Sequence, residues 1–107
     1  MTYLEIPRGI VLHGKHEAAL NHERMREAMR DVRVELRDRF ATAERVVDES
    51  VVRFTLAGPG IDHALLPIGS RAVLRLLHVF EMRAGRIARE RVFEAWAPDD
   101  ELTDEPV

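Results

Sequence analysis

Apolar and polar positions alternate most clearly in residues 71–96, which we predict to form two strands joined by a tight turn at Ala84-Gly85. The turn decides the register of this hairpin. A two-residue turn places His78 opposite Arg91, whereas a three-residue bulged turn places it opposite Val92. We favour the bulged register because it keeps a stripe of arginines out of the apolar face. That face then carries Leu74, Leu76, His78, Phe80, Met82, Glu90, Val92, Glu94 and Trp96.

Residues 3–13 indicate two short strands around a Pro7-Arg8-Gly9 turn or bulge. Residues 15–30 have helical periodicity, and one stripe of this helix carries Ala18, His22, Met25 and Met29.

Residues 32–40 alternate apolar and charged side chains, which predicts a half-buried strand. The following strand ends at 50–58. The turn between them lies either at Ala43-Glu44, with a bulge to absorb the surplus residues, or at 48–50, and we prefer the first. Residues 58–70 are rich in glycine and proline and are expected to form a loop.

This order of elements predicts an α+β fold, in which a curved antiparallel sheet packs on one helix. The chain has 107 residues, enough for one domain, which we place at residues 1–98. Residues 99–107 follow Pro98, contain Pro106 and carry five acidic side chains, and we expect them to form a solvated tail.

Composition excludes several classes of function. The net charge of -3 does not favour nucleic-acid binding, and no cysteine is present for disulfide or thiolate chemistry. No apolar run approaches the ~20 residues of a membrane span, and the first residues do not resemble a signal peptide. We therefore expect a cytoplasmic protein with no membrane or nucleic-acid partner.

The second half of the chain resembles the closing half of SnoaL-like domains, within the nuclear transport factor 2-like superfamily. The first half carries weaker likenesses in residues 5–18 and 31–47, so the resemblance covers roughly residues 3–96. The matching positions are Pro67, Gly69, Arg71, Val79, Phe80, Gly85, Arg86, Ile87, Arg89, Glu90 and Arg91.

The resemblance implies a cone-shaped, cystatin-like α+β barrel around an apolar pocket, and association as a homodimer through the sheet. Members include polyketide cyclases, ketosteroid isomerase-like proteins, epoxide hydrolase-like enzymes and non-catalytic binding domains. Two features depart from the pattern. The usual N-terminal helices are missing, and the aspartate that serves as base in cyclase-like members is replaced near Val92 and Ala95, which leaves Glu94 as the nearby carboxylate.

His78 matches a pocket-lining position in the resemblance and titrates near neutral pH, so it is our candidate for general acid/base catalysis, with Glu94 as a helper. The alternatives are a hydrogen-bonded core histidine and a salt bridge from Glu94 to an arginine. Candidate substrate-binding residues are His22, Met25, Met29, Phe80, Val92 and Trp96. The alternative role for these side chains is core packing. His13 and His16 lack the further ligands that a metal site needs.

Two functions from different classes follow. One is a domain that holds a small apolar or polyketide-like molecule and isomerises, cyclises or opens it by proton transfer, without a cofactor or metal. The other is a non-catalytic ligand-binding or dimerisation module, favoured by the missing lid and the missing aspartate.

Overall fold

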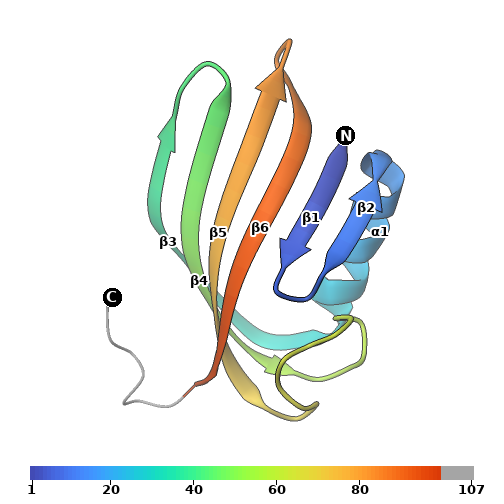
Figure 1. Cartoon of the computed structure of the whole chain (residues 1–107). Helices are drawn as coiled ribbons and strands as arrows, with labels where there is room; N and C mark the ends of the chain where they lie inside the picture. Colours follow the sequence, from blue (N-terminus) through green and yellow to red (C-terminus); the bar gives the residue numbers. More distant parts are fainter. Residues whose placement is uncertain (100–107) are drawn as a thin grey trace.

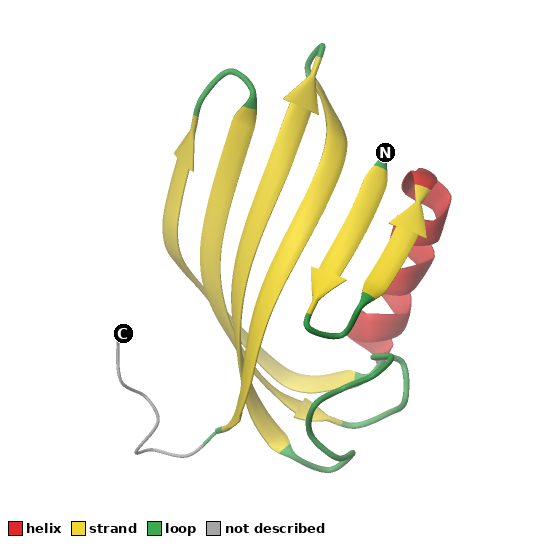
Figure 2. Cartoon of the chain, viewed as in Figure 1, coloured by secondary structure: helices red, strands yellow, loops and turns green. Residues whose placement is uncertain are grey.

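The computed structural model describes residues 1–99. Its elements, in chain order, are β1 (Thr2–Ile6), β2 (Ile10–His13), α1 (Gly14–Glu27), β3 (Met29–Ala41), β4 (Arg45–Leu56), β5 (Arg71–Arg83) and β6 (Arg86–Pro98). The strands form one curved sheet, with α1 beside β1 and β2 (Figures 1 and 2). The α+β class is therefore confirmed. The helix is too short and polar to cross a membrane.

The sheet has the strand order β2-β1-β6-β5-β4-β3 and stays open. Four neighbouring pairs are antiparallel as expected, but β1 runs parallel to β6, so the sheet is mixed. The alternation of apolar and polar residues along a strand indicates which face is buried. It does not indicate which strand from the other end of the chain becomes the neighbour, so the parallel pairing of β1 with β6 was not predicted.

The bulged register of the β5–β6 hairpin is confirmed, with His78 opposite Val92. Ala84 and Gly85 form a two-residue turn with φ of 52° and 74°, the left-handed geometry that matches strand twist. The register then shifts between Glu81 and Met82, so the bulge lies beyond the turn rather than in it.

The β3–β4 hairpin turns between Ala41 and Arg45, which confirms the position at Ala43-Glu44, and two register shifts in β3 absorb the surplus residues. The prediction that this strand is half-buried is wrong. β3 is the outermost strand, and its residues are exposed on both faces, Val34 to 68%. Nothing in the described chain covers this end of the sheet, so alternation here does not produce burial.

Helix α1 is shorter than predicted and ends at Glu27, so Met29 begins β3. The core lies where α1 ends and the 57–70 loop folds back over the sheet (Figure 1). Its buried members are Ala28, Val52, Phe54, Leu56, Ile61, Ala72 and Leu74.

Candidate functional site

Strand pairing brings chemically active side chains to one side of the sheet, which we call the helix-side face because α1 lies over it. Residues paired across neighbouring strands point to the same side of a sheet, and alternate residues point to the other. Asp48, His78, Val92 and Glu5 form one row in register, and Phe80, Glu90 and Tyr3 form the next. The opposite side, which carries Glu49, Leu77 and Phe93, is called the outer face.

His78 is half-buried at the centre of the helix-side face. Burial lowers its pKa, while the nearby charges of Asp48 and Glu94 oppose this shift and His22 adds to it. Its ring stacks on Phe80, with 5.8 Å between centroids and 6° between planes. No hydrogen bond to this ring is found among the described residues. The catalytic role of His78 and the alternative of a core histidine both stay predictions.

Glu94 lies on the same face as His78, and its carboxylate is fully engaged by neighbours. Arg8 donates from Nε to Oε1 at 2.8 Å and from Nη2 to Oε2 at 3.1 Å, and Trp96 Nε1 donates to Oε1 at 3.1 Å. The expected alternative of a salt bridge to an arginine is thus present, although it is buried, because both side chains are at most 1% exposed. The assignment of Glu94 as helper of His78 stays a prediction.

Arg8 anchors a buried polar network that the sequence did not predict. It leaves the turn between β1 and β2, pairs with Glu5 as well as Glu94, and donates from Nη1 to the carbonyl of Asp62 at 2.9 Å. The Tyr3 hydroxyl donates to Glu5. Turn residues are usually exposed, so local sequence gave no sign that this arginine is buried among partners from β6 and the loop.

Glu90 is a second carboxyl group that the sequence placed on this face without assigning it a role. It is opposite Phe80 on β5 and opposite Tyr3 on β1. Burial raises its pKa. Burial, with the charges of Glu90 and Glu94, also raises the pKa of Tyr3 well above its ordinary value. The alternation of Glu90, Val92 and Glu94 was the available signal for this residue.

The residues predicted to line a binding site differ in their burial and in the element that carries them. Val92 is buried beside His78, and Trp96 packs edge-on against Phe54 with 5.9 Å between centroids. Met25 and Met29 pack against the core, Met29 from β3. His22 is exposed on α1, whose side toward the sheet carries buried Asn21 and half-buried Met25 instead. The binding roles of all these residues stay predictions.

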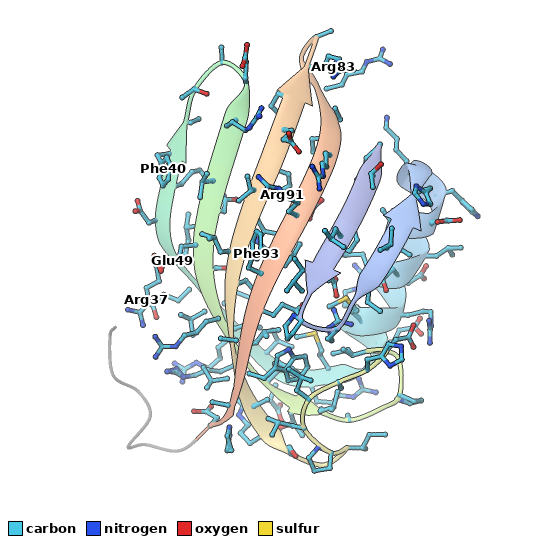
Figure 3. The ribbon with its side chains drawn as sticks, viewed as in Figure 1. Arg37, Phe40, Glu49, Arg83, Arg91 and Phe93 are labelled. Carbon is cyan, nitrogen blue, oxygen red and sulfur yellow. The ribbon has the colours of Figure 1, made fainter. Side chains whose placement is uncertain are left out.

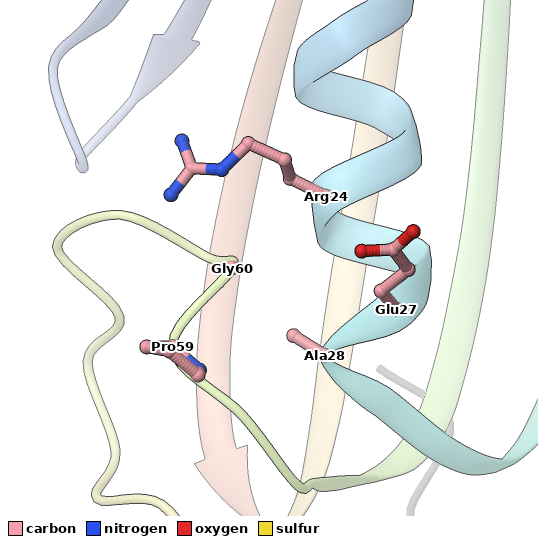
Figure 4. A pocket seen from close by; sticks show the side chains of 5 residues that line it. All are labelled: Arg24, Glu27, Ala28, Pro59 and Gly60. Atoms are coloured by element: carbon pink, nitrogen blue, oxygen red, sulfur yellow. The ribbon is translucent and has the colours of Figure 1, made fainter.

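The hollow shown in Figure 4 lies away from His78, between the end of α1 and the loop. It encloses about 330 Å³ and is lined by Arg24, Glu27, Ala28, Pro59 and Gly60. Gly60 sits against the helix backbone here, since an added Cβ would come 2.1 Å from the carbonyl oxygen of Arg24. We treat this hollow as a packing contact rather than a site.

Comparisons with known proteins agree on a family and a fold. A family model described as "SnoaL-like domain" matches residues 3–90. No curated protein matches the sequence significantly.

Among solved structures, a SnoaL-like polyketide cyclase from Jannaschia sp. CCS1 has a TM-score of 0.73 at 15% identity and covers 88% of this chain and 63% of its own. A protein with a ketosteroid isomerase-like fold from Catenulispora acidiphila, in complex with trimethylamine, has a TM-score of 0.63 at 16% identity and covers 85% of this chain and 63% of its own. An LEH-like epoxide hydrolase from M. tuberculosis has a TM-score of 0.61 at 20% identity and covers 89% and 62%. The chain therefore spans less than two thirds of each of these three proteins.

Proposed function

Because this chain belongs to the SnoaL-like domain family, whose model matches residues 3–90, we propose that its helix-side face binds a small, largely apolar molecule. We further propose that His78 exchanges a proton with this molecule. One observation carries the proposal. His78 combines a lowered pKa with a ring that no described residue hydrogen-bonds, on a face that also carries Phe80 and Trp96. A neutral imidazole at neutral pH can accept a proton from a bound molecule.

The reaction class that suits this arrangement is proton transfer next to a carbonyl. One imidazole nitrogen takes the proton from the carbon beside the carbonyl, and the C–H electron pair becomes the enolate. Return of the proton at another atom gives isomerisation. Attack of the enolate carbon on a second carbonyl forms the C–C bond of an aldol-type cyclisation, and the resulting alkoxide takes the proton back from the imidazolium. Epoxide opening would use the same histidine to activate water. In this proposal Glu94 keeps Arg8 in place and takes no proton.

The second candidate is ligand binding without catalysis, and a separate observation favours it. Val34 and Leu36, on the edge strand β3, lie on the helix-side face and are more than half exposed, so this face is open to water at β3. Proton-transfer sites gain from excluding water, because fixed protein groups then act in a low dielectric.

Binding and catalysis can be tested separately. We expect apolar ligands to change the fluorescence of Trp96, the only tryptophan, and to shift the NMR signals of His78. We expect ketones that bind to exchange α-protons with deuterated solvent, and His78→Gln to abolish the exchange while binding persists. His16→Gln is the matched control, since His16 is exposed on α1. Binding without any exchange would leave the non-catalytic candidate, and no binding across a varied panel would refute the proposal.

A homodimer through the outer face is part of this proposal. Glu49 on β4 is opposite Leu77, and Arg91 on β6 is opposite Val79, so the two charges flank β5 on either side of apolar residues (Figure 3). No described residue forms an ion pair with either, although Arg91 lies over the Phe93 ring at 5.9 Å. In the proposed dimer, the two-fold axis lies in the plane of the interface and crosses β5 obliquely between Leu77 and Val79. This axis places Arg91 of each copy against Glu49 of the other. The cytoplasmic location expected from the sequence stays a prediction.

A further inference from the structure

We propose that the ligand of the helix-side face carries a cationic amine with apolar substituents in addition to its carbonyl group, and that Glu90 holds this amine between Tyr3 and Phe80. This inference rests on the proposed function, because it names the class of molecule that the same face selects.

The geometry places one carboxylate between two aromatic residues. Tyr3, Glu90 and Phe80 stand in register on β1, β6 and β5, so their side chains emerge side by side from the helix-side face. Hydrogen bonding to Glu5 holds the Tyr3 hydroxyl, and stacking on His78 holds the Phe80 ring. All three residues are partly buried, which leaves part of each side chain able to contact a ligand.

The charges on this face are unbalanced. Among its described residues, Arg8 is shared between Glu5 and Glu94, which leaves one negative charge in excess when both are ionised. Arg39 neutralises Asp48 through an ion pair on the neighbouring strands. Arg8 and Arg39 are thereby paired, and no ion pair between described residues includes Glu90.

A cationic ligand would fit both the carboxylate between two aromatic residues and the excess negative charge of this face. An ammonium group attracts the Glu90 carboxylate, and its field interacts favourably with the electron-rich faces of aromatic rings. Because Glu90 is partly removed from water, the attraction is stronger than at an open surface. Apolar substituents on the nitrogen would contact Phe80 and Val92, which adds hydrophobic burial. An anion of the same size would meet the excess negative charge and be repelled.

The test compares phenyltrimethylammonium with its neutral isostere tert-butylbenzene, and adds 4-tert-butylbenzoate as an anion that carries the same tert-butylphenyl group. Affinities are measured by NMR titration, following the backbone amides of residues 3, 78, 80 and 90. We expect phenyltrimethylammonium to bind at least tenfold more tightly than tert-butylbenzene, and the benzoate to bind most weakly. Glu90→Gln should remove the preference for the cation and leave tert-butylbenzene affinity unchanged, which also reports that the variant is folded. Glu35→Gln removes the same charge from the outer face on the exposed strand β3 and should preserve the preference.

Each result has one meaning. Equal affinity for the cation and its neutral isostere, or a cation preference that survives in Glu90→Gln, overturns this inference while the proposed function stands. If none of the probes shifts these amides, the proposed function fails, and the inference fails with it. A cation preference that only Glu90→Gln abolishes supports both.

Discussion

Arg8 shows at the residue scale how a single side chain can join distant parts of the chain. Its guanidinium contacts β1, β6 and the loop through Glu5, Glu94 and Asp62. Removing one member of a buried ion network leaves the others charged without compensation, which costs about 3–5 kcal/mol. We expect Arg8→Met to lower the free energy of unfolding by this amount, measured by urea denaturation.

The matched control is Arg24→Met. Arg24 pairs with Asp62 at 3.1 Å, but both side chains are more than 40% exposed. Exposed pairs contribute about 1 kcal/mol or less. If the two variants lost similar stability, the Arg8 network would be no more than a surface contact.

His78 makes a prediction about pH. Burial lowers its pKa in the folded protein below the ordinary 6.5, so the unfolded chain binds the proton more tightly. The stabilisation is therefore complete above pH 6.5 and is lost as pH falls from there through the lower folded pKa. NMR titration of the imidazole should give a pKa below 6.5, and His78→Gln should flatten the decline in unfolding free energy over this range. A His78 pKa at or above 6.5 would contradict the burial described here.

At the scale of elements, the contact between α1 and the 57–70 loop depends on Gly60. A Cβ at this position would overlap the Arg24 carbonyl, which belongs to the helix backbone and cannot rotate away (Figure 4). Gly60→Ala must push the loop from the helix, and forced overpacking costs about 1–3 kcal/mol. We expect thermal denaturation to show this loss.

Gly58 provides a control in the same loop. An added Cβ there would lie 3.7 Å from the nearest atom, Cα of Ala28, which is an ordinary contact. Gly58→Ala should change the unfolding free energy by less than about 0.5 kcal/mol. Equal losses in both variants would show that the loop needs glycine flexibility rather than close approach to α1.

At the scale of the whole molecule, the proposed dimer can be tested by charge reversal. We expect light scattering to give a dimer mass for the wild-type chain at micromolar concentration. Glu49→Arg should produce a monomer, because it places two arginines against each other across the proposed interface. Adding Arg91→Glu should restore the dimer by exchanging the charges. A wild-type monomer, or a double variant that stays monomeric, would reject this interface.

Features of the fold that depend on residues close together in the sequence could be predicted, and features that depend on distant residues could not. The β5–β6 register could be predicted because a wrong pairing would put arginines on the apolar face, and the Ala43-Glu44 turn follows from neighbouring residues. The exposure of β3 could not, because its apolar alternation is the same whether or not another layer covers it. The helical pattern of residues 15–30 includes Met29 although this residue begins β3, because helical and extended patterns overlap where one element passes directly into the next.

The sequence alone determined the α+β class, the order of elements, the family resemblance and the placement of His78 with Glu94 on one face. These features depend on the spacing of apolar and polar residues within single elements and across one tight turn, and this spacing can be read directly from the sequence. Only the tertiary structure decided that β1 lies parallel to β6, that Arg8 is buried between Glu5 and Glu94, and that Glu90 stands between Tyr3 and Phe80. Those facts depend on which strands become neighbours across some 85 residues of chain, and neighbour choice is set by burying the whole molecule's surface at once.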